Sequence, residues 1–223
     1  MTQPARKLPQ IAPRKRPVQA RSARTVDVLL EAAARVLEER GLAGYTTNAV
    51  AERSGVSVGS LYQYFPNKDA LMSALVLRTH LQVADQLAGL QARLTGWPLA
   101  AAVEEMVRGA VHDARAAPRL LAAVELEEER LPRSAELEAA EAAIHRNLKA
   151  LVSPYLADDI DPARIDRAVQ RIIGIVQGVV DTSVRHPADA EPLEQEVARA
   201  ILGYLTPLLR VERHPLAETR SRV

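Results

Sequence analysis

The chain has 223 residues, of which 48% are hydrophobic and 3% aromatic, and its formal net charge at pH 7 is +1. This length can bury a sizeable core, whereas so few aromatic rings argue against a stacking surface for single-stranded nucleic acid. The absence of cysteine excludes a disulfide framework and a thiolate metal site. Because no secretory signal or apolar run of about 18 residues is recognisable, we expect a soluble cytoplasmic protein without a membrane partner.

The basic side chains are concentrated near the N-terminus. Residues 1–24 carry seven basic side chains and no acidic one, whereas the rest of the chain carries 22 basic and 28 acidic ones. Four prolines between residues 4 and 17 disfavour a helix there. We therefore predict a flexible basic arm over residues 1–22 that follows a DNA backbone or enters the minor groove. The alternative is a tail that only increases solubility.

Two short helices joined by a tight turn are predicted after a first amphipathic helix over residues 23–40. The stretch from Thr46 to Asp69 reads TTNAVAERSGVSVGSLYQYFPNKD. In it, Gly55 can adopt the left-handed conformation that ends one helix, and Ser57 can cap the next. The second helix has small and polar outward side chains, which would let its backbone approach base edges in the major groove. Asn67 is expected to cap the helix that follows.

The segment GVSVGSLYQYFPNKDAL resembles the helix-turn-helix signature of the TetR family of transcriptional regulators, and the resemblance covers roughly the first third of the chain. It implies phosphate contacts from Thr46 or Thr47, Tyr64 and Lys68, base contacts from Val58, Gly59, Ser60 and Gln63, and both kinds from Tyr62. With Ser57 at the helix start, these residues form the predicted DNA-binding site. The two tyrosines could instead pack within the three-helix core, and Lys68 could simply face solvent. Val58 can offer a base only an apolar contact, such as one with a thymine methyl group.

The remainder of the chain is predicted to be helical. A long helix should run from about Asn67 to Leu94, followed by helices near 98–116, 118–130 and 134–156, one that begins at Asp161 and Pro162, and a last one near 192–210. No strand pattern is present, so the predicted fold class is all-α. The expected domains are the arm (1–22), a three-helix helix-turn-helix domain (23–70), a helical effector-binding and dimerisation domain (71–211) and a tail (212–223).

A homodimer is predicted from the helix that follows Pro162. Between Ile172 and Val180 only Gln177 is polar, and a helix that is apolar all round must be covered on all sides. In proteins that resemble this one, the last two helices form the dimer interface. The predicted interface residues are Ile172, Gly174, Ile175, Gly178, Val179, Ile201, Tyr204 and Leu205. The alternative is a core helix buried within one chain.

Signals for catalysis are weak. The five histidines are scattered, no H-E-x-x-H pair occurs, and the glutamates at 125 and 127–129 are interpreted as a solvated helix face. We therefore predict no enzyme activity, no catalytic residue, no cofactor and no metal site. A pocket for a small, mainly apolar effector is predicted around Trp97, Met106, His112 and His145, because such a pocket needs a few polar groups in an aliphatic lining. Each of the four could instead only pack or face solvent.

Taken together, these features predict a homodimeric transcriptional regulator that binds a two-fold symmetric operator in double-stranded DNA. The resemblance implies a repressor that an unknown small-molecule effector releases. An alternative keeps the DNA-binding domain but makes residues 95–160 a protein-interaction module without a small-molecule pocket. The sequence identifies neither the operator nor the effector nor the regulated genes.

Overall fold

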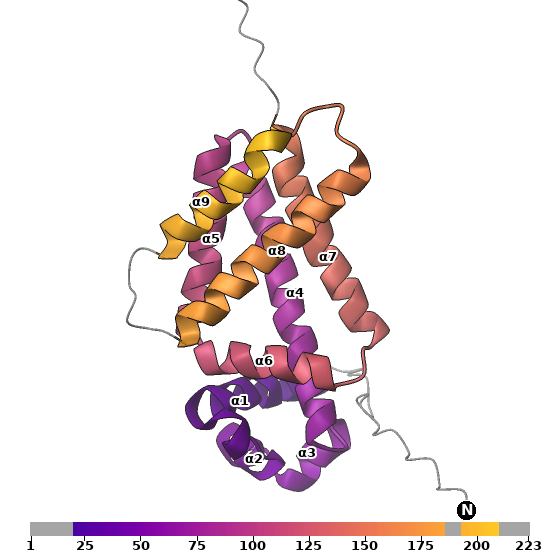
Figure 1. Ribbon diagram of the computed structural model, residues 1–223. Coiled ribbons are helices and arrows are strands. Elements are labelled where there is room, and N and C mark those ends of the chain that lie inside the picture. The colour runs from indigo at the N-terminus through magenta and orange to yellow at the C-terminus, as the bar shows by residue number, and fades with distance from the viewer. Residues whose placement is uncertain (1–19, 186–192, 210–223) are drawn as a thin grey trace, which may run out of the picture. The chain divides into compact units, whose positions relative to one another are not determined.

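All regular elements in the described part of the chain are helices. The computed structural model describes residues 20–185 and 193–209 (Figure 1). Within these ranges there is no strand, and an isolated antiparallel bridge joins Leu156 to Leu209. The elements are α1 (Ala20–Gly44), α2 (Thr47–Ser54), α3 (Val58–Tyr64), α4 (Lys68–Leu94), α5 (Leu99–Ala116), α6 (Pro118–Arg130), α7 (Ala135–Val152), the 3-10 helix η1 (Ser153–Tyr155), α8 (Pro162–Arg185), α9 (Leu193–Leu205) and the 3-10 helix η2 (Thr206–Leu208). The predicted all-α class is confirmed.

Most helix ends lie where capping residues and prolines predict them. Helix α1 contains a break at Gly41, whose φ of 63° is left-handed. Helix α8 begins at Pro162, and the backbone N–H of Ala163 donates to Asp161 Oδ1 at 3.0 Å. Helix α7 stops at Val152, earlier than predicted, because a proline in the following turn cannot donate a helical hydrogen bond.

The first compact unit combines two separate stretches of chain, the described residues up to Gln86 and residues 112–144. Its buried core joins side chains of α1 to α4 with Ala123 and Val124 of α6. Helix α6 is also attached to α1 by polar contacts, since the backbone N–H of Leu120 donates to Glu38 Oε2 at 3.0 Å. Packing thus places α6 with the helix-turn-helix segment, whereas the predicted boundary after residue 70 had placed it in the other domain.

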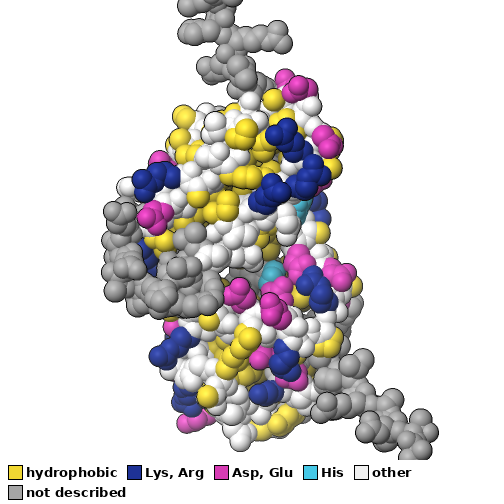
Figure 2. Space-filling view, viewed as in Figure 1, with side chains coloured by type: hydrophobic (Ala, Val, Ile, Leu, Met, Phe, Trp, Pro, Cys, Tyr) yellow, Lys and Arg dark blue, Asp and Glu magenta, His cyan; other side chains and the backbone are white. Residues whose placement is uncertain are grey.

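The second compact unit contains residues 87–111 and the described residues from 145 onward. Its core includes Val107 of α5, Leu148 of α7, Ile172 of α8 and Ile201 of α9, all buried. Figure 2 shows hydrophobic side chains on the face over α8 and α9. No helix in the described ranges is long and apolar enough to cross a membrane.

Candidate nucleic-acid interface

Helices α2 and α3 are joined by the turn that the sequence predicts. The side chain of Thr46 caps α2 by accepting from the backbone N–H of Ala49 at 3.1 Å. Gly55 has a φ of 68°, and its N–H donates to the carbonyl of Glu52 at 3.3 Å. This left-handed residue ends α2 and redirects the chain. Helix α3 therefore begins only four residues after Ser54, at Val58.

Helix α3 has one buried side and one open side. Ser57 caps it by accepting from the N–H of Ser60 at 3.1 Å, and the two hydroxyls lie 2.8 Å apart. Leu61 is fully buried and anchors the inner side. On the outer side Val58 is 37% exposed and Gln63 is exposed as well, while a Cβ added at Gly59 would meet nothing within 4 Å. The open side of α3 is therefore slim and accessible, as entry into the major groove requires.

The two tyrosines of α3 lie in different environments. Tyr62 is 41% exposed, and its hydroxyl lies 3.1 Å from Thr47 Oγ1, which links α3 to the first turn of α2. Tyr64 is half-buried and packs against the core of the first unit. The packing alternative thus describes part of what Tyr64 does and does not describe Tyr62. Their DNA contacts remain predictions.

Helix α4 begins directly beside α3. Asn67 caps it, because its Oδ1 accepts from the N–H of Ala70 at 2.8 Å. Lys68 is exposed at the first position of this helix, and a cation there gains nothing from the helix dipole. The neighbouring Asp69 is paired with Arg130 of α6 at 2.7 Å. The exposed ammonium of Lys68 is therefore suitably placed to meet an anion such as a phosphate.

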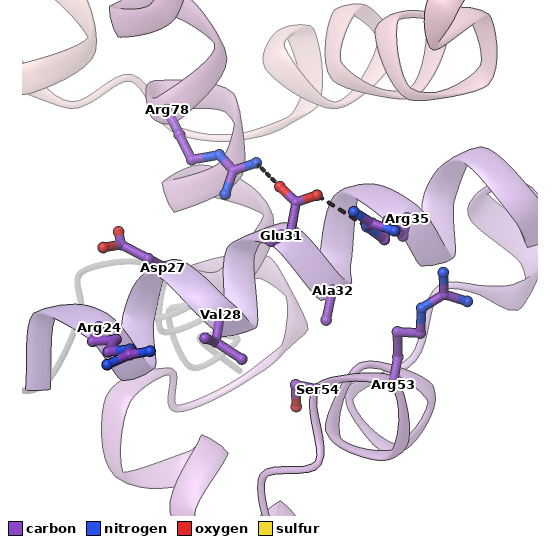
Figure 3. Close-up of a pocket in the computed structure, with 9 residues that line it drawn as sticks. All are labelled: Arg24, Asp27, Val28, Glu31, Ala32, Arg35, Arg53, Ser54 and Arg78. Atoms are coloured by element: carbon purple, nitrogen blue, oxygen red, sulfur yellow. Dashed lines mark hydrogen bonds and ion pairs between the residues drawn. The ribbon is translucent and has the colours of Figure 1, made fainter. Parts of the chain in front are cut away.

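An open cleft of about 510 Å³ lies beside α1 in the same unit (Figure 3). Glu31 accepts from Arg35 and from Arg78, each at 3.0 Å, and these two hydrogen bonds hold the pKa of the Glu31 carboxyl below its ordinary value. A third lining arginine, Arg53, pairs with Glu39 at 2.6 Å. The cleft is lined by Arg24, Asp27, Val28, Glu31, Ala32, Arg35, Arg53, Ser54 and Arg78. Because most of its arginines are already neutralised, the cleft is a weaker candidate anion site than the α3 surface.

The four residues predicted to line an effector pocket are absent from the linings of two cavities of the first unit, the cleft beside α1 and a small cavity near Ser73. Trp97 is 44% exposed, and its carbonyl accepts from the Tyr155 hydroxyl at 2.7 Å. Met106 is buried in the core of the second unit, which agrees with the alternative that it only packs. His145 is half-buried and its Nε2 lies 3.3 Å from the carbonyl of Asp166. His112 is exposed and belongs to the first unit. The pocket stays a prediction.

The predicted dimer interface needs a correction at three positions. Ile172, Ile201 and Leu205 are fully buried by their own chain, so they have no surface to offer a partner. The sequence indicates that α8 is apolar around its circumference, but it does not indicate which side the chain itself covers. These three residues therefore agree with the alternative interpretation, a core buried within one chain.

The other predicted interface positions remain at the surface of the second unit. Gly174 and Gly178 are exposed, and Ile175 and Tyr204 are half-buried. Arg171 lies over the Tyr204 ring, with its guanidinium carbon 5.7 Å from the ring centre, and donates to the tyrosine hydroxyl at 3.0 Å. The side chain of Val179 lies outside the described residues.

The sequence predicts that the glutamate run of α6 is a solvated helix face. In the structure, only part of this run is exposed. Glu125 and Glu129 are exposed, whereas Glu127 and Glu128 are half-buried. Glu127 accepts from Arg130, and Glu128 Oε2 lies 3.3 Å from Nε2 of His80 on α4. Sequence reasoning missed the second pairing because the two residues are far apart in the chain, so no spacing rule connects them.

Two models of one protein family match the chain. The model described as bacterial regulatory proteins of the tetR family matches residues 29–75, which include the turn and α3. The model described as the tetracyclin repressor-like C-terminal domain matches residues 98–205. The two matched segments contain the α3 surface and the helices α8 and α9, respectively.

Individual relatives agree with the family match. A TetR-family transcriptional regulator from Mesorhizobium loti shares the fold with a TM-score of 0.68 and 16% identity, over 86% of this chain and all of that one. SmeT, the repressor of a Stenotrophomonas maltophilia multidrug efflux pump, gives a TM-score of 0.61 and 19% identity over 84% of this chain and 91% of that one. The nucleoid occlusion factor SlmA of Haemophilus ducreyi is 36% identical over 78 residues, which are 35% of each protein. A second SlmA, from Glaesserella parasuis, is 31% identical over 39% of each protein, so this chain spans little more than a third of the curated relatives that it matches. The helix-turn-helix match and the C-terminal match together establish that this chain belongs to the TetR family.

Proposed function

We propose that this chain is a sequence-specific transcriptional regulator that reads double-stranded DNA with α3. The observation that carries the proposal is the accessible outer side of α3, held in place by the buried Leu61 and by the cap at Ser57. Val58 and Gln63 offer an apolar and an amide contact to base edges, and Gly59 keeps the helix slim. The exposed Lys68 and Tyr62 border this surface and suit phosphate contacts.

Selection of bound duplexes from a random or genomic library tests this proposal. The wild-type protein should enrich one sequence, and Val58→Ala should change the preferred base at one position of each half-site, because it removes a contact to a base edge. A variant at an exposed position of α6, Leu126→Ala, should leave the sequence unchanged. Binding without any sequence enrichment would show that the protein recognises only the DNA backbone.

We also propose that the functional unit is a homodimer. Helix α3 has seven residues and is therefore about 10 Å long, which spans roughly three base pairs at 3.4 Å each. A single copy reads too few base pairs to define a unique site, and two copies related by a two-fold axis double the length of the sequence that is read.

The second unit supplies a surface that suits such a dimer. Gly174 and Gly178 lie one helical turn apart on the exposed side of α8, where each costs helix stability relative to alanine. A Cβ at either position would meet nothing within 4 Å, so the fold of the single chain does not require a glycine there. A partner helix that packs closely against α8 would require it. Half-buried Ile175 and Tyr204 would add apolar contacts beside the glycines.

An effector-controlled repressor is the specific form of this proposal. SmeT, which shares the fold, is named as the repressor of an efflux pump. An effector bound in the second unit would favour a dimer geometry in which the two α3 helices do not fit successive grooves, and the shift cannot exceed its differential affinity for the two states. Operator DNA must then weaken effector binding by the same factor by which effector weakens DNA binding. Compounds that bind the chain but leave operator affinity unchanged would instead favour a protein-interaction module. Action on DNA also implies a cytoplasmic location.

A further inference from the structure

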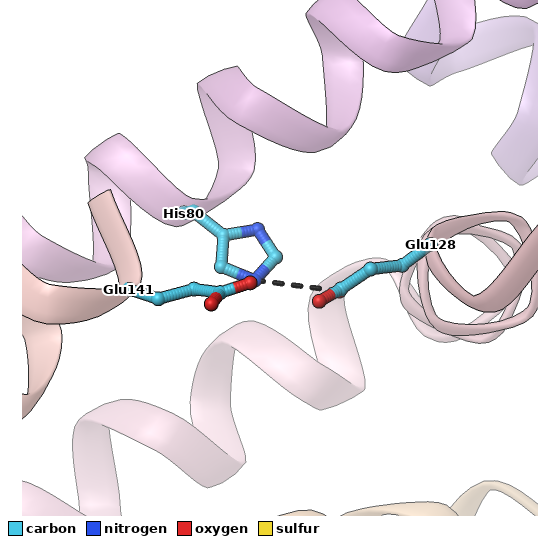
Figure 4. Close-up of side chains that lie close together, drawn as sticks. All are labelled: His80, Glu128 and Glu141. Atoms are coloured by element: carbon cyan, nitrogen blue, oxygen red, sulfur yellow. Dashed lines mark ion pairs between the residues drawn. The ribbon is translucent and has the colours of Figure 1, made fainter. Parts of the chain in front are cut away.

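Three potential metal ligands from three helices meet inside the first unit (Figure 4). His80 comes from α4, Glu128 from α6 and Glu141 from α7, and one ligand atom of each lies within 4.8 Å of the others. All three are partly buried, with side-chain exposures of 17%, 25% and 32%. The group therefore differs from a set of acidic residues on an exposed helix face, because tertiary packing brings its members together from distant parts of the sequence.

The ring of His80 is oriented as a metal ligand would be. Its Nδ1 lies 3.0 Å from the carbonyl oxygen of Val76, and since a carbonyl can only accept, Nδ1–H is the donor. In the neutral ring, Nε2 then carries the free lone pair. This nitrogen faces Glu128 Oε2 at 3.3 Å. Histidines that bind metals commonly donate their other N–H to a backbone carbonyl in this way.

The carboxylates of Glu128 and Glu141 both lie beside the His80 ring (Figure 4), and each has one oxygen near Arg133. On the outer side, Arg133 donates to Glu141 Oε2, and its Nη1 lies 4.0 Å from Glu128 Oε1. On the inner side, Glu141 Oε1 is buried without a hydrogen-bond partner. Negative charge on the inner oxygens is therefore poorly compensated by the protein itself.

We propose that His80 Nε2, Glu128 Oε2 and Glu141 Oε1 bind a first-row divalent transition-metal ion, with water in the remaining positions. Zinc at about 2.0–2.1 Å from tetrahedral ligands separates those ligands by about 3.4 Å, which agrees with the 3.3 Å between His80 and Glu128. The remaining separations are at most 4.8 Å, so the side chains must rotate to bring these atoms up to about 1.4 Å closer. Because calcium and magnesium prefer ligand sets made of oxygen atoms, the imidazole nitrogen favours zinc or a neighbouring transition metal.

Such an ion would link three helices of the first unit. It would join α4, which starts beside α3, to α6, which packs against α1, and to α7. Arg133 would remain in contact with the outer carboxylate oxygens and hold them in place. This site shares no residue with the proposed DNA surface or with the proposed dimer interface. A negative result for the metal site would therefore leave the regulator proposal unaffected.

Calorimetric titration of the chelator-treated full chain with Zn²⁺ tests the proposal. We expect one binding site per chain and a loss of affinity of about tenfold or more in Glu141→Gln and in His80→Gln. Two matched variants, Glu125→Gln on the exposed side of α6 and His112→Gln, should bind Zn²⁺ as the wild type does. Equal concentrations of Mg²⁺ or Ca²⁺ should not compete.

Cobalt gives a second readout that reports the ligands directly. Co²⁺ bound at this site should show the visible absorption of a nitrogen and oxygen ligand set, and this absorption should disappear in Glu141→Gln while the helical circular dichroism stays unchanged. If His80→Gln does not fold, Glu141→Gln decides. Absence of Zn²⁺ binding by the wild type would overturn the proposal, and so would equal affinity in wild type and Glu141→Gln. In either case the contact between His80 and Glu128 is a polar contact within the protein and not part of a metal site.

Discussion

Replacing Gly178 with leucine should slightly increase the stability of the single chain and decrease the stability of its dimer. A Cβ at this position meets nothing within 4 Å in the single chain. Because glycine inside a helix is less favourable than leucine by somewhat less than 1 kcal/mol, the single chain should become slightly more stable. In the dimer, each leucine enters a packed interface at a cost of about 1–3 kcal/mol, and the two-fold axis doubles that cost to about 2–6 kcal/mol. At about 1.4 kcal/mol per factor of ten, the dimer should weaken by roughly 30-fold to 10⁴-fold.

Sedimentation equilibrium over a range of protein concentrations measures this effect. Gly109→Leu is the matched control, because Gly109 is also an exposed glycine within a helix of the second unit and has the same open surroundings. That control should gain helix stability and leave dimerisation unchanged. If Gly178→Leu dimerises like the wild type, the interface lies elsewhere. A loss of helicity in the monomeric variant would refute the inference that the position is open within the single chain.

Three further predictions concern the DNA-binding unit. Lys68→Ala should reduce the slope of log affinity against log salt by about one, because one phosphate contact is lost, whereas a substitution that contacts only bases should leave the slope unchanged. Removing residues 1–19, which lie outside the described residues, should weaken DNA binding without changing the thermal melt, and equal affinity would reduce the arm to a solubility tail. Hydrogen bonds from Arg35 and Arg78 lower the pKa of Glu31 from its ordinary 4.5. The ionised Glu31 therefore stabilises the fold above pH 4.5. This stabilisation is lost as the pH falls through the lowered pKa of the folded chain. Glu31→Gln should therefore lose less stability on acidification below pH 4.5, and an identical acid melt in wild type and variant would show that these hydrogen bonds contribute nothing measurable.

Features set by neighbouring residues could be predicted from the sequence. The caps at Ser57 and Asn67, the left-handed turn at Gly55 and the start of α8 at Pro162 are where the capping rules place them. Each depends on a side chain and a backbone group only a few residues apart. For the same reason the helix-turn-helix segment and the all-α class could be identified without knowledge of tertiary packing.

Features set by distant residues could not be predicted. The hydrophobic pattern of α6 shows that one side is buried, but it does not reveal that α1 is the element that buries it. On α8, the sequence could not separate Ile172, which the chain itself covers, from the exposed Gly174. The approach of His80 to Glu128 likewise depends on how α4 and α6 pack. In each case the periodicity identifies a face, while the partner of that face is a property of the folded chain.

We propose above that two copies of α3 read one operator. Hydroxyl-radical footprinting on the duplex selected by the protein, combined with the measured number of chains per duplex, tests it most directly. We expect two chains per operator and two protected stretches related by a two-fold axis, with centres about 34–36 Å apart or a multiple of that distance. One chain on a single protected half-site, or protection that does not depend on sequence, would contradict it.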